Sequence, residues 1–392
     1  MPFAPRLPCV KGVQPFGCRG DCLKKEIIAF SFILEHILEK NEGGRSGLFR
    51  GERMRELISG GSPALWLTLG LVTAVILVNG GTDAPNAIAT CVGSGALGLR
   101  PALLLAAGMN FLGVWTAARG QARVAATLCH IADFGPDPAR GLLGLCAALT
   151  AIVIWAVAAW YFGIPTSESH ALMAGLAGAA LGMPGAAGSL QPGAWQWVFG
   201  GLGLSAILGF GLGFWLTRGF SALSRGRRTA AFFRRGQVGG AAAMAFCHGA
   251  QDGQKFMGVF WLGAALARGK TGGMPAAMPF GLTVYCALCM ALGTALGGRR
   301  IIRAVGQEMT PLSPLQGFAA DVAGAVCLLL STAGGLPVST THTKTTAVMG
   351  AGAAGDWHSV DWGLAREMVL AWVLTFPGCG MIGFGLVKLL VK

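Results

Sequence analysis

The chain has 392 residues, of which 53% are hydrophobic and 12% charged, about half the charged share of a soluble domain. This composition argues against a soluble all-helical protein, because soluble helices need a polar face. A net charge of +13 would suggest nucleic-acid binding in a soluble protein, but here the basic residues collect in short loops between apolar segments.

Residues 1–60 differ from the rest of the chain. They mix both charge signs, and their apolar run 27–38 is too short to cross a bilayer. They do not resemble a signal peptide, because no small-residue cleavage site follows a long apolar stretch. We predict an N-terminal extension, either a short cytoplasmic or peripheral helix or a segment left untranslated because synthesis starts at Met54.

The first repeat is predicted over residues 61–185. An apolar run from residue 62 is interrupted at Asn79–Asn86, where a glycine pair and a proline predict a helix break. Spans are expected near 101–118 and 141–163, and the second leads into Pro165-Thr-Ser-Glu-Ser-His170. Irregular backbone at membrane depth needs protein or a water-filled cavity around it.

Residues 186–237 join the two repeats. They hold one further apolar span, 194–217, and then the segment 218–237, which carries six arginines and no acidic residue. By the positive-inside rule this basic loop is expected on the cytoplasmic side.

The second repeat, 238–356, has its motifs and apolar spans in the same order as the first. Residues 357–392 are predicted to form a C-terminal membrane helix. Gly249-Ala-Gln-Asp252 corresponds to Gly80-Gly-Thr-Asp83, and Pro337-Val-Ser-Thr-Thr-His342 corresponds to the Pro165 motif. The aspartate and the first serine are 84 residues apart in one copy and 87 in the other. We predict an all-α polytopic membrane protein with two inverted-topology repeats, broken or re-entrant helices and about 10–12 membrane segments.

The two aspartates indicate cation binding. Asp83 and Asp252 each follow glycines at a predicted helix break, and a carboxylate at membrane depth usually faces a cavity or a cation. Freed backbone carbonyls and a carboxylate together suit Na⁺ or H⁺. Capping of the next helix is the alternative for either aspartate alone.

The hydroxyl residues indicate anion binding. Ser167, Ser169, Ser339, Thr340 and Thr341 follow prolines at predicted helix starts, where unpaired backbone N–H groups and the positive dipole end favour anions. Two such starts, one from each repeat, predict a compact oxyanion site. Ordinary N-capping is the alternative.

Other polar residues at these motifs have candidate roles. Lys255 and Lys344 are predicted to balance the charge of the anion, and Glu168 to carry a proton. His170 and His342 are expected to hold the motif backbone, and Asp321 is a further candidate whose alternative is a structural ion pair. The scattered cysteines predict neither a disulfide nor a metal site, and no cofactor is expected.

Four linked motifs resemble the signatures of the inorganic phosphate transporter (PiT) family. Asn79–Thr90 resembles its Gly-Ala-Asn-Asp-Val-Ala-Asn-Ala motif, and His248–Gly258 resembles the second copy. Pro337–His342 resembles its Pro-Val-Ser-Thr-Thr-His motif, and Pro165–His170 is the other copy of that motif. The resemblance covers about residues 62–390. It implies secondary active import of inorganic phosphate by alternating access, with H⁺ or Na⁺ symport and no enzyme activity.

The resemblance also implies site residues. It adds Gln254 to the phosphate ligands and Asn86 to the coupling-ion residues, beside Asp83, Asp252 and Glu168, with the two aspartates holding Na⁺ if sodium is the coupling ion. Thr82 and Gln251 stand where the family has asparagine, and Glu168 where it has threonine, which favours proton coupling.

Alternatives remain open. A sulfate or related oxyanion carrier would share this build, and an anion channel or an enzyme has less support from the sequence. The expected partners are phosphate, a coupling cation and membrane lipid, with no nucleic acid and with a homodimer left open. The expected location is the plasma membrane, with several passes.

Overall fold

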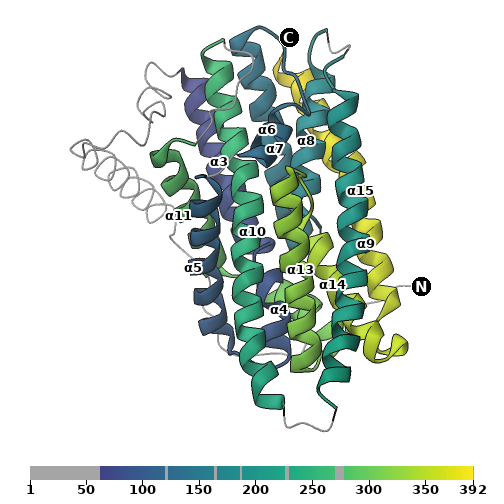
Figure 1. Ribbon diagram of the computed structural model, residues 1–392. Coiled ribbons are helices and arrows are strands. Elements are labelled where there is room, and N and C mark those ends of the chain that lie inside the picture. Colours follow the sequence, from purple (N-terminus) through teal and green to yellow (C-terminus); the bar gives the residue numbers. More distant parts are fainter. Residues whose placement is uncertain are drawn as a thin grey trace, which may run out of the picture. The chain divides into compact units, whose positions relative to one another are not determined.

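The structure is a computed structural model that describes residues 62–119, 122–162, 166–185, 188–225, 229–269 and 278–391. The predicted N-terminal extension and its Met54 start lie outside these residues. The described part is helical (Figure 1). Its helices are α3 (Pro63–Thr82), α4 (Asn86–Gly93), α5 (Leu99–Ala117), α6 (Arg123–Cys129), α7 (Pro138–Phe162), α8 (Glu168–Gly182), α9 (Pro192–Leu223), α10 (Ala230–Ala267), α11 (Phe280–Leu296), α12 (Arg299–Arg303), the π-helix η1 (Ala304–Glu308), α13 (Pro314–Gly334), α14 (Thr340–Gly355), the 3₁₀ helix η2 (Trp357–Ser359) and α15 (Trp362–Leu390).

Several long helices begin at local capping signals. Ser62 accepts a hydrogen bond from the backbone N–H of Leu65, and Pro63 follows it as the first residue of α3. Ser313 and Gln316 form a capping box at the start of α13, and Asp361 caps α15. A capping side chain satisfies one of the N–H groups that the first turn of a helix leaves unpaired, so the sequence determines these helix starts locally.

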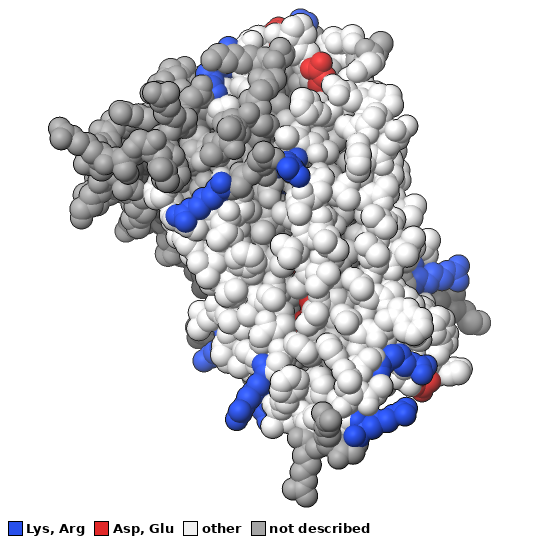
Figure 2. Space-filling model, in the orientation of Figure 1, with Lys and Arg blue, Asp and Glu red and all other residues white. Residues whose placement is uncertain are grey.

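Five described helical segments are long and apolar enough to cross a membrane, or six if the bent pair of α11 with α12–η1 is one span. Helices α8 and α14, of 15 and 16 residues, are shorter than the ~20 residues that a straight helix needs to cross the hydrocarbon core. On the face in Figure 2, charged side chains lie mostly toward the two ends of the helices, with a broad uncharged belt between them.

The first predicted helix break is confirmed and the second is wrong. α3 ends at Thr82 and α4 begins at Asn86, because Pro85 cannot donate a hydrogen bond to a continuing helix. α10 instead runs unbroken for 38 residues through Asp252 (Figure 1). The second motif has no proline, and a helix can include its glycines.

Helices of one half pack on helices of the other in a reciprocal way. α9 packs on α14 as α15 packs on α8, and α3 packs on α11 as α10 packs on α5. The motif glycines lie at two of these crossings. A Cβ at Gly80 would lie 2.7 Å from the carbonyl oxygen of Met290 on α11, and one at Gly249 would lie 2.8 Å from Cα of Asn110 on α5. The all-helical fold of two repeats is confirmed by this arrangement, and small residues let the backbones approach.

The crossing of α8 and α15 provides a stability test. A Cβ at Gly178 would overlap the carbonyl oxygen of Gly380, whereas Gly203 on α9 has open space around the same position. We predict that Gly178→Ala lowers the free energy of unfolding by ~1–3 kcal/mol through overpacking. Gly203→Ala should leave it unchanged or raise it slightly, because alanine favours helix. Thermal unfolding of the purified protein in detergent would measure both, and equal midpoints would contradict the close crossing.

Candidate functional site

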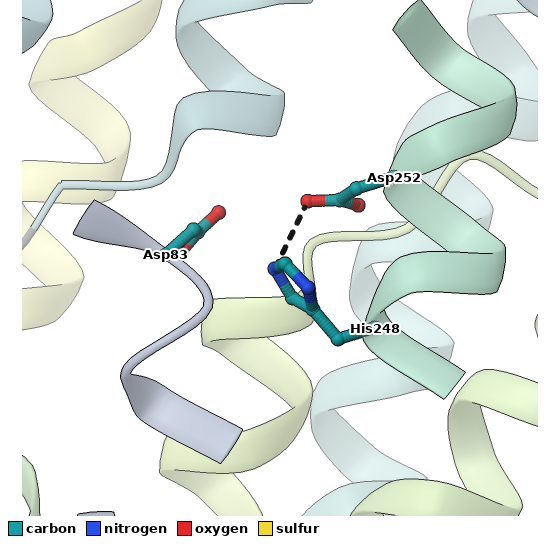
Figure 3. A group of neighbouring side chains, drawn as sticks. All are labelled: Asp83, His248 and Asp252. Atoms are coloured by element: carbon teal, nitrogen blue, oxygen red, sulfur yellow. Dashed lines mark ion pairs between the residues drawn. The ribbon is translucent and has the colours of Figure 1, made fainter. Parts of the chain in front are cut away.

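The four sequence motifs converge in the interior of the described bundle. Asp83 follows α3 at the helix break, and Asp252 lies on α10. A residue in the first turn of α8 contacts Lys255 of α10, and one in the first turn of α14 contacts Asp83. Figure 3 shows Asp83 and Asp252 facing one another across a short gap, with His248 beside them. All three side chains are at most 1% exposed, so the site is enclosed by protein.

Asp83 has neutral hydrogen-bond partners. Its Oδ1 accepts a hydrogen bond from the hydroxyl of Thr341 and another from the amide of Asn86 at 3.2 Å. The Asn86 amide also lies 3.1 Å from the Thr341 hydroxyl. The broken helix of the first half is thereby joined to the first turn of α14 in the second half.

Asp252 has a charged partner. Its Oδ1 accepts a hydrogen bond from Nζ of Lys255 at 2.6 Å. The same ammonium donates to the hydroxyl of Ser169 and to the carbonyl oxygen of Val338, each at 2.6 Å. An ammonium has three N–H donors, so protein acceptors use all of them.

A second group of contacts joins the two carboxylates. The hydroxyl of Thr340 lies 3.4 Å from Oδ2 of both Asp83 and Asp252. Asn79 donates to Asp252 Oδ2 at 3.2 Å, and Nε2 of His248 lies 3.5 Å from the same oxygen (Figure 3). One ligand atom each from Asp83, His248 and Asp252 lie within 4.8 Å of one another, so these side chains could hold a cation.

Asn79 and His248 contact Asp252, although no role is predicted for them from the sequence. Both lie four residues before the motif aspartate of their copy, so a comparison of the two copies position by position would have pointed to them. His248 is held by Asn110 of α5, whose Oδ1 lies 2.8 Å from its Nδ1.

The helix starts of α8 and α14 meet through their capping serines. The hydroxyls of Ser167 and Ser339 lie 2.7 Å apart. Each also accepts a hydrogen bond from its own helix, from the N–H of His170 at 3.3 Å and of His342 at 3.1 Å. The capping that was the alternative to anion binding is therefore present, and the two positive dipole ends lie side by side at the site.

The two histidines lie behind these serines. The ring centroids of His170 and His342 are 4.3 Å apart, and His342 also packs on Trp372 of α15 with a centroid distance of 3.7 Å. This position agrees with the supporting role predicted for them, which stays a prediction.

Glu168 lies beside the helix break, whereas Gln254 contacts α6. Thr82 donates to Oε1 of Glu168 at 3.2 Å, whereas the buried Oε2 has no hydrogen-bond partner among the described residues. Oε1 of Gln254 accepts a hydrogen bond from the backbone N–H of Val124 at 3.2 Å. Gln254 therefore holds α6 against α10 in this structure.

Lys344 lies one helical turn away from the site residues of α14. It forms a fully buried ion pair with Asp321 of α13, and Thr90 of α4 donates to the same carboxylate at 2.7 Å. The structure thus places Lys344 with a protein partner, so its contact with phosphate stays a prediction. The equivalent positions of the first half hold Leu149 and Leu172, and the pair has no counterpart there.

Known proteins resemble this chain over most of its length. It matches the phosphate transporter family over residues 79–228 and 219–383. It is 36% identical over 341 residues to a Mycobacterium bovis protein named "Probable low-affinity inorganic phosphate transporter", with 82% of this chain and 77% of that protein covered. A Bacillus subtilis protein of the same name is 36% identical, with 81% and 96% covered.

One solved structure shares the fold. It is titled "The sodium-dependent phosphate transporter", and it superposes with a TM-score of 0.74 at 21% sequence identity. The match covers 84% of this chain and 99% of that one. The predicted inverted-repeat fold agrees with this similarity.

The Asp321–Lys344 pair leads to a test of stability. Removing one partner of a buried ion pair leaves an uncompensated charge, so Asp321→Leu should lower the free energy of unfolding by about 3–5 kcal/mol. Adding Lys344→Leu should recover most of this loss, since both positions then hold the leucines of the first half. Unfolding of the purified single and double variants would measure this, and additive losses would contradict it.

Proposed function

This chain belongs to the phosphate transporter family, and on that premise we propose that it imports inorganic phosphate by alternating access, driven by Na⁺ or H⁺. The main support is the convergence of one buried carboxylate and one helix start from each half at a single enclosed site. An oxyanion needs N–H and hydroxyl donors, a coupling cation needs carboxylate oxygens, and transport requires both together.

In the proposal, phosphate binds at the starts of α8 and α14. Its oxygens would accept hydrogen bonds from backbone N–H groups and from the hydroxyls at the two starts, with Gln254 nearby; these hydroxyls belong to Ser167, Ser169, Ser339, Thr340 and Thr341. The hydroxyls of Ser167 and Ser339 now contact one another, and phosphate would take the place of that contact. The helix dipoles favour the anion without adding a full charge, which permits release.

The coupling cation would bind at the carboxylates. Asp83, Asn86 and Asp252 supply oxygen ligands of the kind that hard cations prefer. Cation binding would neutralise charge beside the phosphate, so each ion favours binding of the other. Movement of one repeat, 61–185, against the other, 238–356, would then expose the site to either side.

The proposed orientation of the protein in the membrane follows from the positive charge of the α9–α10 connection. Described arginines at 218, 225, 234 and 235 lie at the α9–α10 connection, at the ends of two helices. In a plasma membrane, the positive-inside rule places this connection in the cytoplasm.

Uptake into proteoliposomes tests the function. We expect wild-type protein to accumulate labelled phosphate under an imposed Na⁺ or H⁺ gradient, and unlabelled sulfate to compete poorly. Asp83→Asn should reduce uptake at least ~10-fold, because loss of the charge removes the cation's main electrostatic partner. Asp252→Asn should reduce it by a similar factor, because the nearby buried Lys255 ammonium loses its carboxylate partner. Asp133→Asn, at an exposed position, is the matched control. Normal uptake by both site variants would refute the assignment of the coupling-ion residues.

Substitution of Glu168 tests whether phosphate uptake is coupled to protons. Its buried oxygen without a described partner is a suitable acceptor for a proton that moves with phosphate. We expect Glu168→Gln to reduce uptake driven by a pH gradient by roughly 10-fold or more, while uptake driven by Na⁺, if present, persists. Equal loss of both would indicate a structural role for this side chain.

A further inference from the structure

The two motif aspartates have equivalent surroundings in the two halves. Asn86 lies three residues after Asp83 and contacts both that carboxylate and the Thr341 hydroxyl. Lys255 lies three residues after Asp252 and contacts that carboxylate and the Ser169 hydroxyl. Thr341 and Ser169 are in turn equivalent, since each lies two residues after the motif serine of its helix start. Asn86 and Lys255 therefore occupy the same place in the two copies.

The surroundings of the Lys255 ammonium are those of a bound cation. A carboxylate, a hydroxyl and a backbone carbonyl each lie 2.6 Å from Nζ, and the side chain is 2% exposed. Carboxylate and carbonyl oxygens together are the ligands that hold Na⁺ at broken helices of transporters. In this structure all three of its donors are used by protein oxygens.

Asp83 has no ammonium within hydrogen-bond distance among the described residues. Its hydrogen-bond donors in that part of the chain are Asn86, Thr340 and Thr341, all of them neutral. A buried carboxylate with neutral partners attracts a mobile cation, whereas Asp252 already has a covalently attached one.

We infer that the ammonium of Lys255 is a tethered cation that permanently fills the cation site of the second half. The mobile monovalent cation then binds at the first-half site, around Asp83, Asn86 and Thr341. This narrows the proposed cation ligands, because Asp252 pairs with the tethered ammonium and does not bind the mobile ion itself. This inference rests on the proposed function only in taking that mobile ion as the coupling ion. The expected consequence is that the chain moves one cation fewer per phosphate than a carrier with asparagine at both positions.

The first half of the chain indicates which substitution of Lys255 tests the inference. Lys255→Asn places the residue of the first half into the second and leaves space beside Asp252, the Ser169 hydroxyl and the Val338 carbonyl. It should create one additional Na⁺ site per molecule. Lys255→Met removes the charge but fills the space with an apolar chain, so it should create none. Ser169→Ala added to Lys255→Asn should weaken the extra site, because it removes one ligand.

Equilibrium binding of ²²Na⁺ to the full-length protein in detergent, without phosphate, tests the inference. We expect Lys255→Asn to bind one Na⁺ more than wild type, and Lys255→Met to bind the same number as wild type. If Lys255→Asn binds no additional Na⁺ and instead raises the KM for phosphate uptake, Lys255 is a phosphate ligand and the inference is wrong. Size-exclusion profiles establish folding, and Lys255→Gln replaces the asparagine variant if that variant does not fold.

A transport measurement separates this inference from the proposed function. In proteoliposomes, the number of charges moved per phosphate should rise by one in Lys255→Asn relative to wild type. An unchanged number would overturn the tethered-cation role. If wild-type protein takes up no phosphate, the proposed function fails, but the Na⁺ binding measured without phosphate still decides whether Lys255 fills a cation site.

Discussion

Burial of two carboxylates in one site is the constraint on which the surrounding structure depends. Asp83 and Asp252 are almost completely enclosed, and an ionised group without water needs partners within hydrogen-bond distance. Those partners come from distant parts of the chain. The first turn of α14 reaches back to Asp83, and the Ser169 hydroxyl of α8 completes the shell of the lysine that pairs with Asp252. The site can form only when the two repeats pack together.

Close helix crossings make this packing possible. Gly80 and Gly249 lie three residues before the two aspartates, at positions where a methyl group would press on the neighbouring helix. Each of these glycines faces a helix of the opposite half. The same residues that bring the carboxylates together thus join the repeats, so changes to the packing and to the site are coupled.

The two repeats share the order of their helices but differ at the motifs, both in the course of the helix and in the side chains beside the aspartates. Pro85 breaks the first motif helix, whereas α10 continues through the second motif. A neutral amide lies beside Asp83, and an ammonium lies beside Asp252. These differences are the basis for the inference that the first half holds a mobile cation and that Lys255 fills the corresponding site of the second half.

The sequence alone determined the membrane class, the duplicated order of motifs, the helix starts at capping residues and the break at Pro85, because these depend on local composition and backbone chemistry. It did not determine the unbroken course of α10, since glycines permit either a break or a tightly packed helix, and α10 packs on several other helices, α5 and α13 above all. Nor did it determine the partners of the lysines. Asp252 lies only three residues before Lys255, but the Ser169 and Val338 oxygens lie on other segments. Asp321, the partner of Lys344, also lies on another helix, so these contacts were decided by the tertiary structure.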